Sequence, residues 1–435
     1  MALAPTPTDR GLSLRPGRFG TLVEALGYAA RARTGMSFHD TRGNLAEALP
    51  YSVLAEEARE AGRRLLGLGL VPGDRVGLVA ETDADFVRAF MGAVLAGLVP
   101  CPMPLPTAFG ARADYAGQLR RIADVADVAA VILAEPYRAL VADALQDRHF
   151  LHLGPLDAID ARPGRLPPPP SPDALAYLQF SSGTTRAPRG IGVTHRALMA
   201  NIEGMAQAFA LGPSDRGMSW LPFYHDMGLV GCLLLPIATQ MSIDYLATRD
   251  FIRRPGLWPA MISRARVTMS YSPSFGYQLA ARRARLSGPL DLSCWRIAGI
   301  GGDMIKTGNL DEFARVYAEH GFMAESFLPS YGMAELALGF TFATRGAGCR
   351  AETLDTAELE QGEAVLAADS TNGARAFARC GYPLPGHEMQ VRDDLGRLLG
   401  PRKVGRIFAR GPSVMQGYFR DAAATGAVLS GDGWL

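Results

Sequence analysis

The chain has 435 residues, of which 48% are hydrophobic, and its 44 Lys and Arg against 43 Asp and Glu leave a formal net charge of +1. A chain of this length is too long for one compact core, so we expect two or three subdomains. The near balance of charge argues against a protein that binds nucleic acid, because such a protein carries a basic excess for phosphate contacts.

Neither a secretory signal nor a membrane span is predicted. The N-terminal residues lack an apolar h-region. The most apolar run, 228–238, contains a proline and has about half the length of a spanning helix. The five cysteines are scattered, odd in number and without metal-ligand spacing. Reduced thiols in a cytoplasmic protein are therefore favoured over disulfides or zinc.

Helical and strand patterns alternate over residues 1–160. The apolar residues of 51–70 share one helical face: Leu54, Ala58, Ala61, Leu65 and Leu66. Residues 75–80 and 128–135 are apolar runs typical of buried strands, and Thr82 and Asp83 are candidate caps of a helix between them. Strands that alternate with helices predict a parallel sheet flanked by helices.

A proline-rich stretch, 161–174, predicts a stiff extended connector to the next part of the chain. After it, 175–180 is predicted as a strand, 181–190 ("SSGTTRAPRG") as a loop and 194–209 as a helix. This order aims the loop at a helix N-terminus, where N–H groups and the helix dipole favour an anion. Strand and helix patterns continue to about 343, and shorter, turn-rich strands follow.

Three stretches hold residues suited to chemistry. The loop 181–190 offers hydroxyls, glycines and arginines to a polyphosphate, but it fails the Walker pattern and alone is more often a surface connection. The stretch 220–229, "WLPFYHDMGL", holds His225 and Asp226, which alone are more often a satisfied histidine and a helix cap. In 330–338, "SYGMAELAL", the lone carboxylate is that of Glu335, which alone could equally be a solvent-exposed acidic residue at the start of a helix.

Together, in this order and at this spacing, these stretches resemble the adenylate-forming enzymes, and among them most closely the fatty acyl-AMP ligases. The resemblance runs from about residue 50 to the last residue. The motifs that establish it are "LQFSSGTTRAPRG", "WLPFYHDMGLVG", "SYSPSFGYQLAARR", "PSYGMAELALGFTF" and "CGYPLPGHEMQV". It implies an α/β fold with two helix-flanked, mainly parallel sheets and a small β-barrel-like subdomain. We expect an N-terminal subdomain over 1–165, a second over 166–345 with the site, and an insertion with the small β subdomain over 346–435.

The resemblance also implies roles for individual residues. Tyr331 would lie against the adenine ring, Glu335 would hold Mg²⁺, and His225 would sit where the substrate carboxylate meets the α-phosphate of ATP. The loop over the β- and γ-phosphates would comprise Ser181, Ser182, Gly183, Thr184, Thr185, Arg189 and Gly190. The nucleotide would further contact Gly301, Gly302, Asp303, Ser330, Gly332 and Met333. The fatty acid would contact Asp226, Gly228, Ser270, Ser272, Pro273 and Phe275.

Two arginines depart from the family's pattern. Arg189 stands where the family usually has lysine, and it keeps the positive charge while adding a fork of donors. Arg186 stands where the family usually has glycine and adds bulk at a tight place in the loop. The implied reaction needs no protein nucleophile, because aligning a carboxylate with the α-phosphorus and neutralising the leaving pyrophosphate are sufficient.

More than forty residues separate Glu335 from the "CGYPLPG" motif that begins at Cys380. Fatty acyl-AMP ligases have an insertion here that disfavours transfer to CoA, so the acyl group would pass to the phosphopantetheine of an acyl carrier protein or of a carrier domain. A tolerated surface loop is the simpler alternative. The carrier would belong to a polyketide, nonribosomal or lipid synthase.

The chain stops at "GDGWL", where the family continues into a ribose-binding aspartate, a hinge and a mobile C-terminal domain with the catalytic lysine; Asp432 precedes the tryptophan and does not match that aspartate. We therefore expect an N-terminal core that binds nucleotide and acyl chain weakly and turns over poorly. Two alternatives to acyl-AMP formation for a carrier stay open. The first is a fatty acyl-CoA ligase, and the second is a non-catalytic module that binds acyl chains or adenylates.

Overall fold

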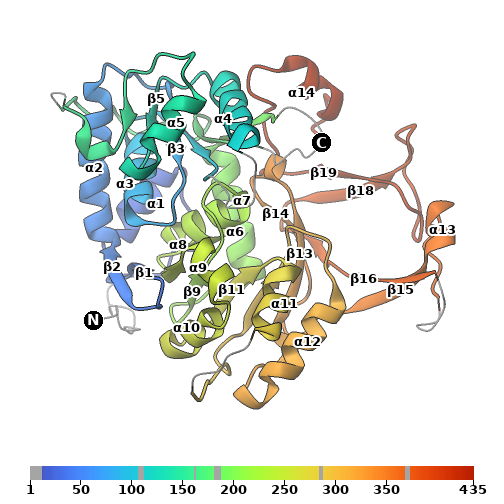
Figure 1. The fold of residues 1–435 in the computed structure, drawn as a ribbon. Helices are drawn as coiled ribbons and strands as arrows, with labels where there is room; N and C mark the ends of the chain where they lie inside the picture. Colours follow the sequence, from blue (N-terminus) through green and yellow to red (C-terminus); the bar gives the residue numbers. More distant parts are fainter. Residues whose placement is uncertain (1–11, 106–111, 161–162, 181–187, 284–287, 368–372) are drawn as a thin grey trace.

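The computed structural model describes residues 12–105, 112–160, 163–180, 188–283, 288–367 and 373–435 (Figure 1). Its largest element is a nine-stranded sheet with the order β17-β14-β13-β12-β11-β9-β10-β1-β2. The central strands from β1 to β13 run parallel, whereas β2, β14 and β17 run antiparallel at the edges. The strands are β1 (Gly35–His39), β2 (Leu45–Pro50), β9 (Arg216–Ser219), β10 (Ser242–Leu246), β11 (Met269–Ser272), β12 (Ile297–Ile300), β13 (Phe327–Gly332), β14 (Gly339–Phe342) and β17 (Tyr382–Pro383).

A second sheet of four parallel strands has the order β4-β3-β5-β6. Its strands are β3 (Arg75–Val79), β4 (Val99–Met103), β5 (Ala130–Ile132) and β6 (Leu153–Gly154). Strands β1 and β2 precede residue 165 but belong to the larger sheet, so the predicted boundary at 165 does not separate the two sheets. The division into three subdomains stays a prediction.

Helices cover both faces of the four-stranded sheet. Val76 and Leu78 of β3 share a core with α1 (Leu22–Ala29), α2 (Tyr51–Gly67) and α3 (Ala84–Leu95). Val79 and Cys101 point the other way, into a second core with α4 (Arg112–Ala126) and α5 (Arg138–Ala144). This alternation along β3 follows from the two-residue period of a strand. The α/β class with parallel, helix-flanked sheets is therefore confirmed.

Helices α2 and α3 pack closely because glycines face each other. A Cβ added at Gly92 of α3 would lie 2.6 Å from Cβ of Ala61 and 2.9 Å from the backbone nitrogen of Gly62, both on α2. The predicted face of α2 is buried, except that Leu66 is half-buried. Asp83 caps α3 as predicted, since its Oδ1 accepts a 2.8 Å hydrogen bond from the Phe86 N–H.

The predicted strand–loop–helix order around 181–190 is wrong in one respect. The loop joins two strands, β7 (Leu175–Phe180) and β8 (Gly190–Thr194), which pair antiparallel from Phe180↔Gly190 to Leu175↔Thr194. Helix α6 (His195–Ala208) follows β8 and begins at the end of this hairpin away from the loop. The alternating Ile191 and Val193 are both buried and form a strand that separates the loop from the helix N-terminus.

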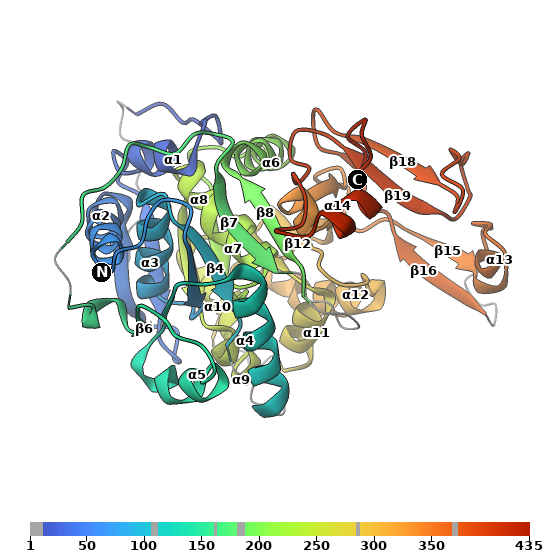
Figure 2. The same ribbon diagram turned by 90° about the horizontal axis from the view of Figure 1, so that it is seen from above.

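Beyond residue 345 the described chain forms two antiparallel ribbons rather than a barrel. They are β15 (Ala351–Asp355) with β16 (Ala374–Ala378), and β18 (Glu388–Arg392) with β19 (Arg406–Arg410). Figures 1 and 2 show both ribbons projecting from one side of the body. Ribbon β15–β16, with α13 (Thr356–Glu360) at its tip, is formed by the residues of the predicted insertion.

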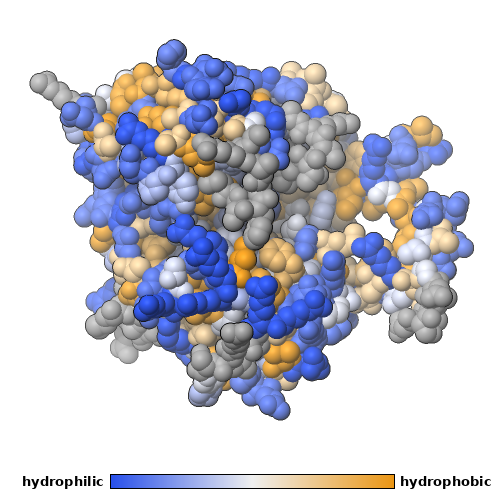
Figure 3. Space-filling model, viewed as in Figure 1, coloured by the Kyte–Doolittle hydropathy of each residue, from blue (hydrophilic) through white to orange (hydrophobic). Residues whose placement is uncertain are grey.

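The remaining helices are α7 (Asp226–Leu229), α8 (Leu235–Ala238), α9 (Thr248–Arg253), α10 (Leu257–Ala265), α11 (Ser274–Arg282), α12 (Thr307–Tyr317) and α14 (Ala422–Val428). Figure 3 shows hydrophilic residues spread over most of the face seen there, with apolar residues between them in small groups. Within the described ranges, none of the helices is both long and apolar enough to cross a membrane.

Candidate functional site

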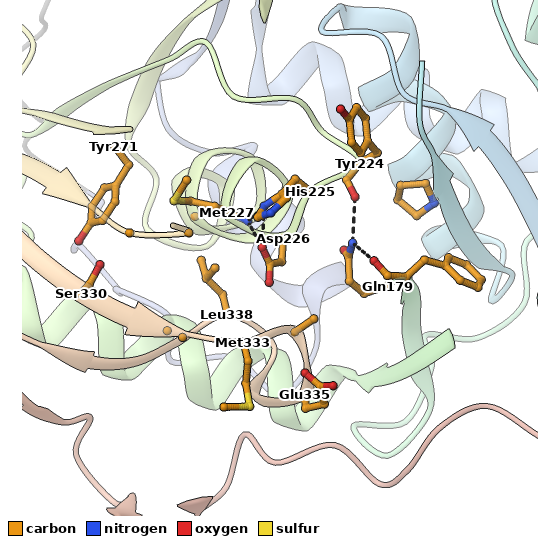
Figure 4. A pocket seen from close by; sticks show the side chains of 18 of the residues that line it. Gln179, Tyr224, His225, Asp226, Met227, Tyr271, Ser330, Met333, Glu335 and Leu338 are labelled. Carbon is orange, nitrogen blue, oxygen red and sulfur yellow. Dashed lines mark hydrogen bonds and ion pairs between the residues drawn. The ribbon is translucent and has the colours of Figure 1, made fainter. Parts of the chain in front are cut away.

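A cavity of about 310 Å³ lies at the carboxyl ends of the parallel strands in the nine-stranded sheet. Because β9, β11, β12 and β13 are parallel neighbours, the segments that follow β9, β12 and β13 emerge at one edge. That edge brings together predicted site residues from three motifs (Figure 4). The predicted residues that line the cavity are His225, Asp226, Gly301, Gly302, Ser330, Tyr331, Gly332, Met333 and Glu335.

Other predicted residues lie outside this lining: Arg189, Gly190, Gly228, Ser270, Ser272, Pro273, Phe275 and Asp303. Some of them have clear structural partners. Ser270 is buried, accepts a 2.9 Å hydrogen bond from the Trp258 indole and donates one to a backbone carbonyl. Asp303 Oδ1 accepts 3.1 Å hydrogen bonds from the N–H and the hydroxyl of Ser274, and so caps the start of α11. Ser181, Ser182, Gly183, Thr184, Thr185 and Arg186 lie outside the described residues.

His225 and Asp226 form a pair at the start of α7. His225 Nδ1 lies 2.7 Å from Asp226 Oδ1, and the Asp226 carboxylate also accepts a 2.7 Å hydrogen bond from the Met227 N–H. The Met227 N–H also lies 3.2 Å from His225 Nδ1, and the short contact with Asp226 favours a proton on that nitrogen. Burial alone would lower the pKa of His225, but the hydrogen bond and the charge of Asp226 outweigh it and raise the pKa above 6.5.

Glu335 receives its hydrogen bond from a distant part of the chain. The Tyr418 hydroxyl donates to Glu335 Oε1 at 3.0 Å, and the Met415 N–H donates to the Glu335 carbonyl at 2.8 Å. Burial raises the pKa of Tyr418, and the Glu335 carboxylate raises it further. The guanidinium of Arg189 lies 4.9 Å from the centre of the Tyr418 ring, within cation–π range. Tyr418 thus contacts both Glu335 and Arg189.

Backbone contacts hold Tyr418 in this place. Ile191 of β8 forms an antiparallel bridge with Tyr418, and the Phe419 N–H donates a 2.7 Å hydrogen bond to the Gly190 carbonyl. The segment around Tyr418 therefore lies beside the first residues of β8. In consequence, it meets the chain immediately after the hydroxyl-rich loop.

Several lining residues were missed by the sequence analysis. Gln179 and Tyr224 stand inside quoted motifs, and the Gln179 amide donates a 2.9 Å hydrogen bond to the Tyr224 carbonyl (Figure 4). Met205 and Phe209 gave no signal, because they lie on the apolar side of α6, where core residues are expected. Apart from Asp226 and Glu335, the lining is mostly aromatic, aliphatic or glycine. Its further members are Pro102, Pro104, Gln118, Ile122, Phe180, Pro188, Met227, Gly231, Tyr271, Ala334, Leu338, Gly339 and Phe342.

Comparison with known proteins places these features in a family. The model of the family described as AMP-binding enzyme matches residues 33–419. A Caulobacter vibrioides protein named "Putative acyl-CoA synthetase" is 46% identical over 439 residues, which is 100% of this chain and 76% of that protein. A medium-chain-fatty-acid–[acyl-carrier-protein] ligase of Teredinibacter turnerae is 35% identical over 266 residues, 60% of this chain and 41% of that protein.

A solved structure from a study of fatty acyl-adenylate ligases of E. coli and L. pneumophila is also similar. It superposes with a TM-score of 0.92 at 40% identity and covers 97% of this chain and 77% of its own. The likeness therefore extends over both sheets and the ribbons beyond residue 345.

Proposed function

The chain belongs to the AMP-binding enzyme family, and from this premise we propose that it activates the carboxylate of a fatty acid with ATP. The products are acyl-adenylate and pyrophosphate. The observation that supports this most is the meeting of His225, Tyr331 and Glu335 at one cavity whose remaining lining is mostly apolar. Such a cavity offers polar groups to an adenylate and apolar surface to an alkyl chain.

The site residues suit the requirements of this reaction. A carboxylate and ATP repel each other, so the pair must be aligned and its charge neutralised. His225, whose pKa is raised by Asp226, would place its ring where the substrate carboxylate would meet the α-phosphate. Tyr331 would stack on adenine, with Gly301 and Gly302 on the opposite side of the ring. Arg189 and the loop 181–187 would bind the β- and γ-phosphates.

Glu335 fits a magnesium ion that is shared with the nucleotide. Mg²⁺ prefers oxygen ligands and is commonly held by one or two carboxylates plus substrate phosphates. Of the two carboxylates that line the cavity, Asp226 is paired with His225, which leaves Glu335 for this mode of binding. When bound, the ion would neutralise charge on the phosphate oxygens. Tyr418 would hold the Glu335 carboxylate in position toward it.

We further propose a carrier protein as the acyl acceptor, on the phosphopantetheine thiol. The Teredinibacter turnerae relative, named as an acyl-carrier-protein ligase, supports this choice. The name of the Caulobacter vibrioides relative instead favours CoA. Product analysis with a holo-carrier protein and CoA as competing acceptors separates the two. The five cysteines are all free, which suits the reducing cytoplasm, where we place the reaction.

Calorimetric titration with a non-hydrolysable acyl-adenylate mimic tests the adenylate site, and Tyr331→Ala is the matched variant. We expect saturable binding that is at least tenfold weaker in the variant, because the stacking surface is lost. A folded protein that binds no mimic of any chain length would contradict the proposal. Binding of mimics without ATP–pyrophosphate exchange, even with the lysine-bearing C-terminal domain of a relative fused on, would favour the non-catalytic module.

A further inference from the structure

Phe342, the last residue of β14, lines two cavities at once. The inner one is the candidate site, and the outer one, about 360 Å³, lies beside β17 and the end of α6. The other residues around the outer cavity are Ala208, Ala343, Thr344, Arg345, Tyr382, Pro383, Leu384 and Pro385. Phe342 therefore borders both the candidate site and a second hollow of mixed polar and apolar lining.

The Phe342 ring is held firmly in this position. Only 8% of the residue is exposed, and its ring meets the Phe209 ring edge to face, with centroids 5.1 Å apart. A Cβ added at Gly339 would lie 2.6 Å from Phe342 Cζ and 3.1 Å from the Met205 sulfur. The ring thus occupies space that exists because residue 339 has no side chain.

The inner cavity has a polar part and an apolar part. His225, Asp226 and Glu335 supply polar groups, whereas Met205 and Phe209 lie near Phe342. A fatty acid would place its carboxylate at the polar groups and its alkyl chain in the apolar part, because burial of methylenes is favourable. The distal end of the chain would then point toward Phe342.

The outer cavity continues in the same direction. Phe342 and Tyr382 are direct partners across the β14–β17 pair, so their side chains share one face of the sheet. Tyr382 is 76% exposed, and the outer cavity, which it lines together with Phe342, is open to solvent and combines alanine, proline and leucine with Thr344 and Arg345. Both cavities therefore border on Phe342, and the outer one opens to the surface.

We propose that Phe342 sets the upper limit of acyl chain length, so that the protein rejects acids longer than this limit. This inference rests on the proposed adenylation of a fatty acid. The ring closes the inner cavity, and the first methylenes that exceed its length must displace the ring from Phe209 and Gly339. In a variant without the ring, the same methylenes enter the outer cavity.

The test is calorimetric titration of the whole chain with non-hydrolysable acyl-adenylate mimics that carry butanoyl, octanoyl, dodecanoyl or hexadecanoyl groups. For the wild type, affinity should rise roughly fourfold for each buried methylene up to a limit and then fall at least tenfold. Phe342→Ala should abolish this fall, so that hexadecanoyl binds at least as tightly as octanoyl. Phe342→Leu, which removes less of the buried side chain, should shift the limit to longer chains in the same direction.

Tyr382→Ala is the matched control, since it removes an aromatic ring from the outer side only and should leave the chain-length profile unchanged. Binding by the wild type with the same profile in folded Phe342→Leu and Phe342→Ala would overturn the inference and leave the adenylation proposal standing. Absence of binding at every chain length in the wild type would overturn both. If Phe342→Ala does not fold, Phe342→Leu decides the question.

Discussion

The hydroxyl of Tyr418 donates a 3.0 Å hydrogen bond to the carboxylate of Glu335. On the same tyrosine, the ring face receives the guanidinium of Arg189. Glu335 is the candidate metal ligand, and Arg189 is the candidate phosphate-binding cation. One side chain therefore fixes the positions of the two groups that would act on opposite charges of a bound Mg²⁺–ATP.

Tyr418→Phe should weaken binding of Mg²⁺ together with non-hydrolysable ATP by roughly tenfold. The variant keeps the ring under Arg189 but loses a hydrogen bond to a charged group, worth about 1.5–3 kcal/mol, and partial exposure favours the lower end. Equilibrium titration measures the change. Tyr382→Phe, at the exposed tyrosine of β17, should have no effect, and an equal loss in both variants would contradict a specific role for Tyr418.

Asp226→Asn should lower the pKa of His225. Asp226 raises that pKa above 6.5 against the effect of burial, so without the carboxylate burial prevails and the pKa falls below 6.5. NMR titration of the His225 ring protons, assigned with His225→Gln, follows the shift. Asp393→Asn, in the turn of the β18–β19 ribbon, is the control and should leave the His225 curve in place.

Asp226→Asn should also change how the stability of the folded protein depends on pH. The pKa of His225 is higher in the folded state than in the unfolded state. The stabilisation that the protonated ring gives the folded protein is therefore complete below the unfolded pKa and is lost as pH rises through the folded pKa. The wild type should therefore lose more stability than Asp226→Asn between mildly acidic and mildly alkaline pH. Equal losses in the two proteins would show that Asp226 does not act through His225.

Gly92→Ala should destabilise the protein by about 1–3 kcal/mol, because the new Cβ would lie 2.6 Å from the Ala61 Cβ and push α2 and α3 apart. Gly27→Ala provides the opposite case. Gly27 lies in α1 with nothing within 4 Å of its added Cβ, so the exchange should stabilise by about 0.5–1 kcal/mol. Thermal unfolding midpoints should move in opposite directions, and movement in the same direction would refute the packing argument.

Asn201→Ala should lower stability by about 2–4 kcal/mol. Asn201 is fully buried on α6, donates to the Gly339 carbonyl at 2.7 Å and accepts from the Gly339 N–H at 3.1 Å. The substitution leaves the buried N–H and carbonyl of Gly339 without the Asn201 amide as their hydrogen-bond partner. Denaturant unfolding measures the loss, and Gln207→Ala, on the exposed side of the same helix, should change stability by about 0.5 kcal/mol or less. A small loss in Asn201→Ala would mean that water replaces the amide.

Local patterns in the sequence were sufficient for the parts of the fold that depend on neighbours along the chain. The buried face of α2 and the cap at Asp83 follow from residues three or four positions apart. The order β7–loop–β8 was missed, because glycine at 190 and 192 weakens the strand signal and a helix follows at once. Strand β8 can be assigned correctly only from its pairing with β7, and no local pattern in the sequence shows that pairing.

The candidate site was predictable to the extent that its residues stand in motifs. His225 comes from one motif and Tyr331 and Glu335 from another, and the two motifs meet because β9 and β13 run parallel in one sheet. Tyr418 stands in no quoted motif, and Phe342 ends one but was given no role there, since each acts through a contact with a distant segment. A tyrosine in a turn-rich segment and a phenylalanine in a strand have no sequence feature that distinguishes them from core residues.

The pairing of Phe419 with Gly190 and of Tyr418 with Ile191 has a consequence for synthesis on the ribosome. A nascent chain emerges from its N-terminus, and domains generally begin to fold in that order. Every parallel strand of both sheets precedes Glu335, so these strands leave the ribosome well before Tyr418 does. The growing polypeptide therefore exposes Glu335 and the end of the hydroxyl-rich loop without their shared tyrosine until Tyr418 has left the ribosome.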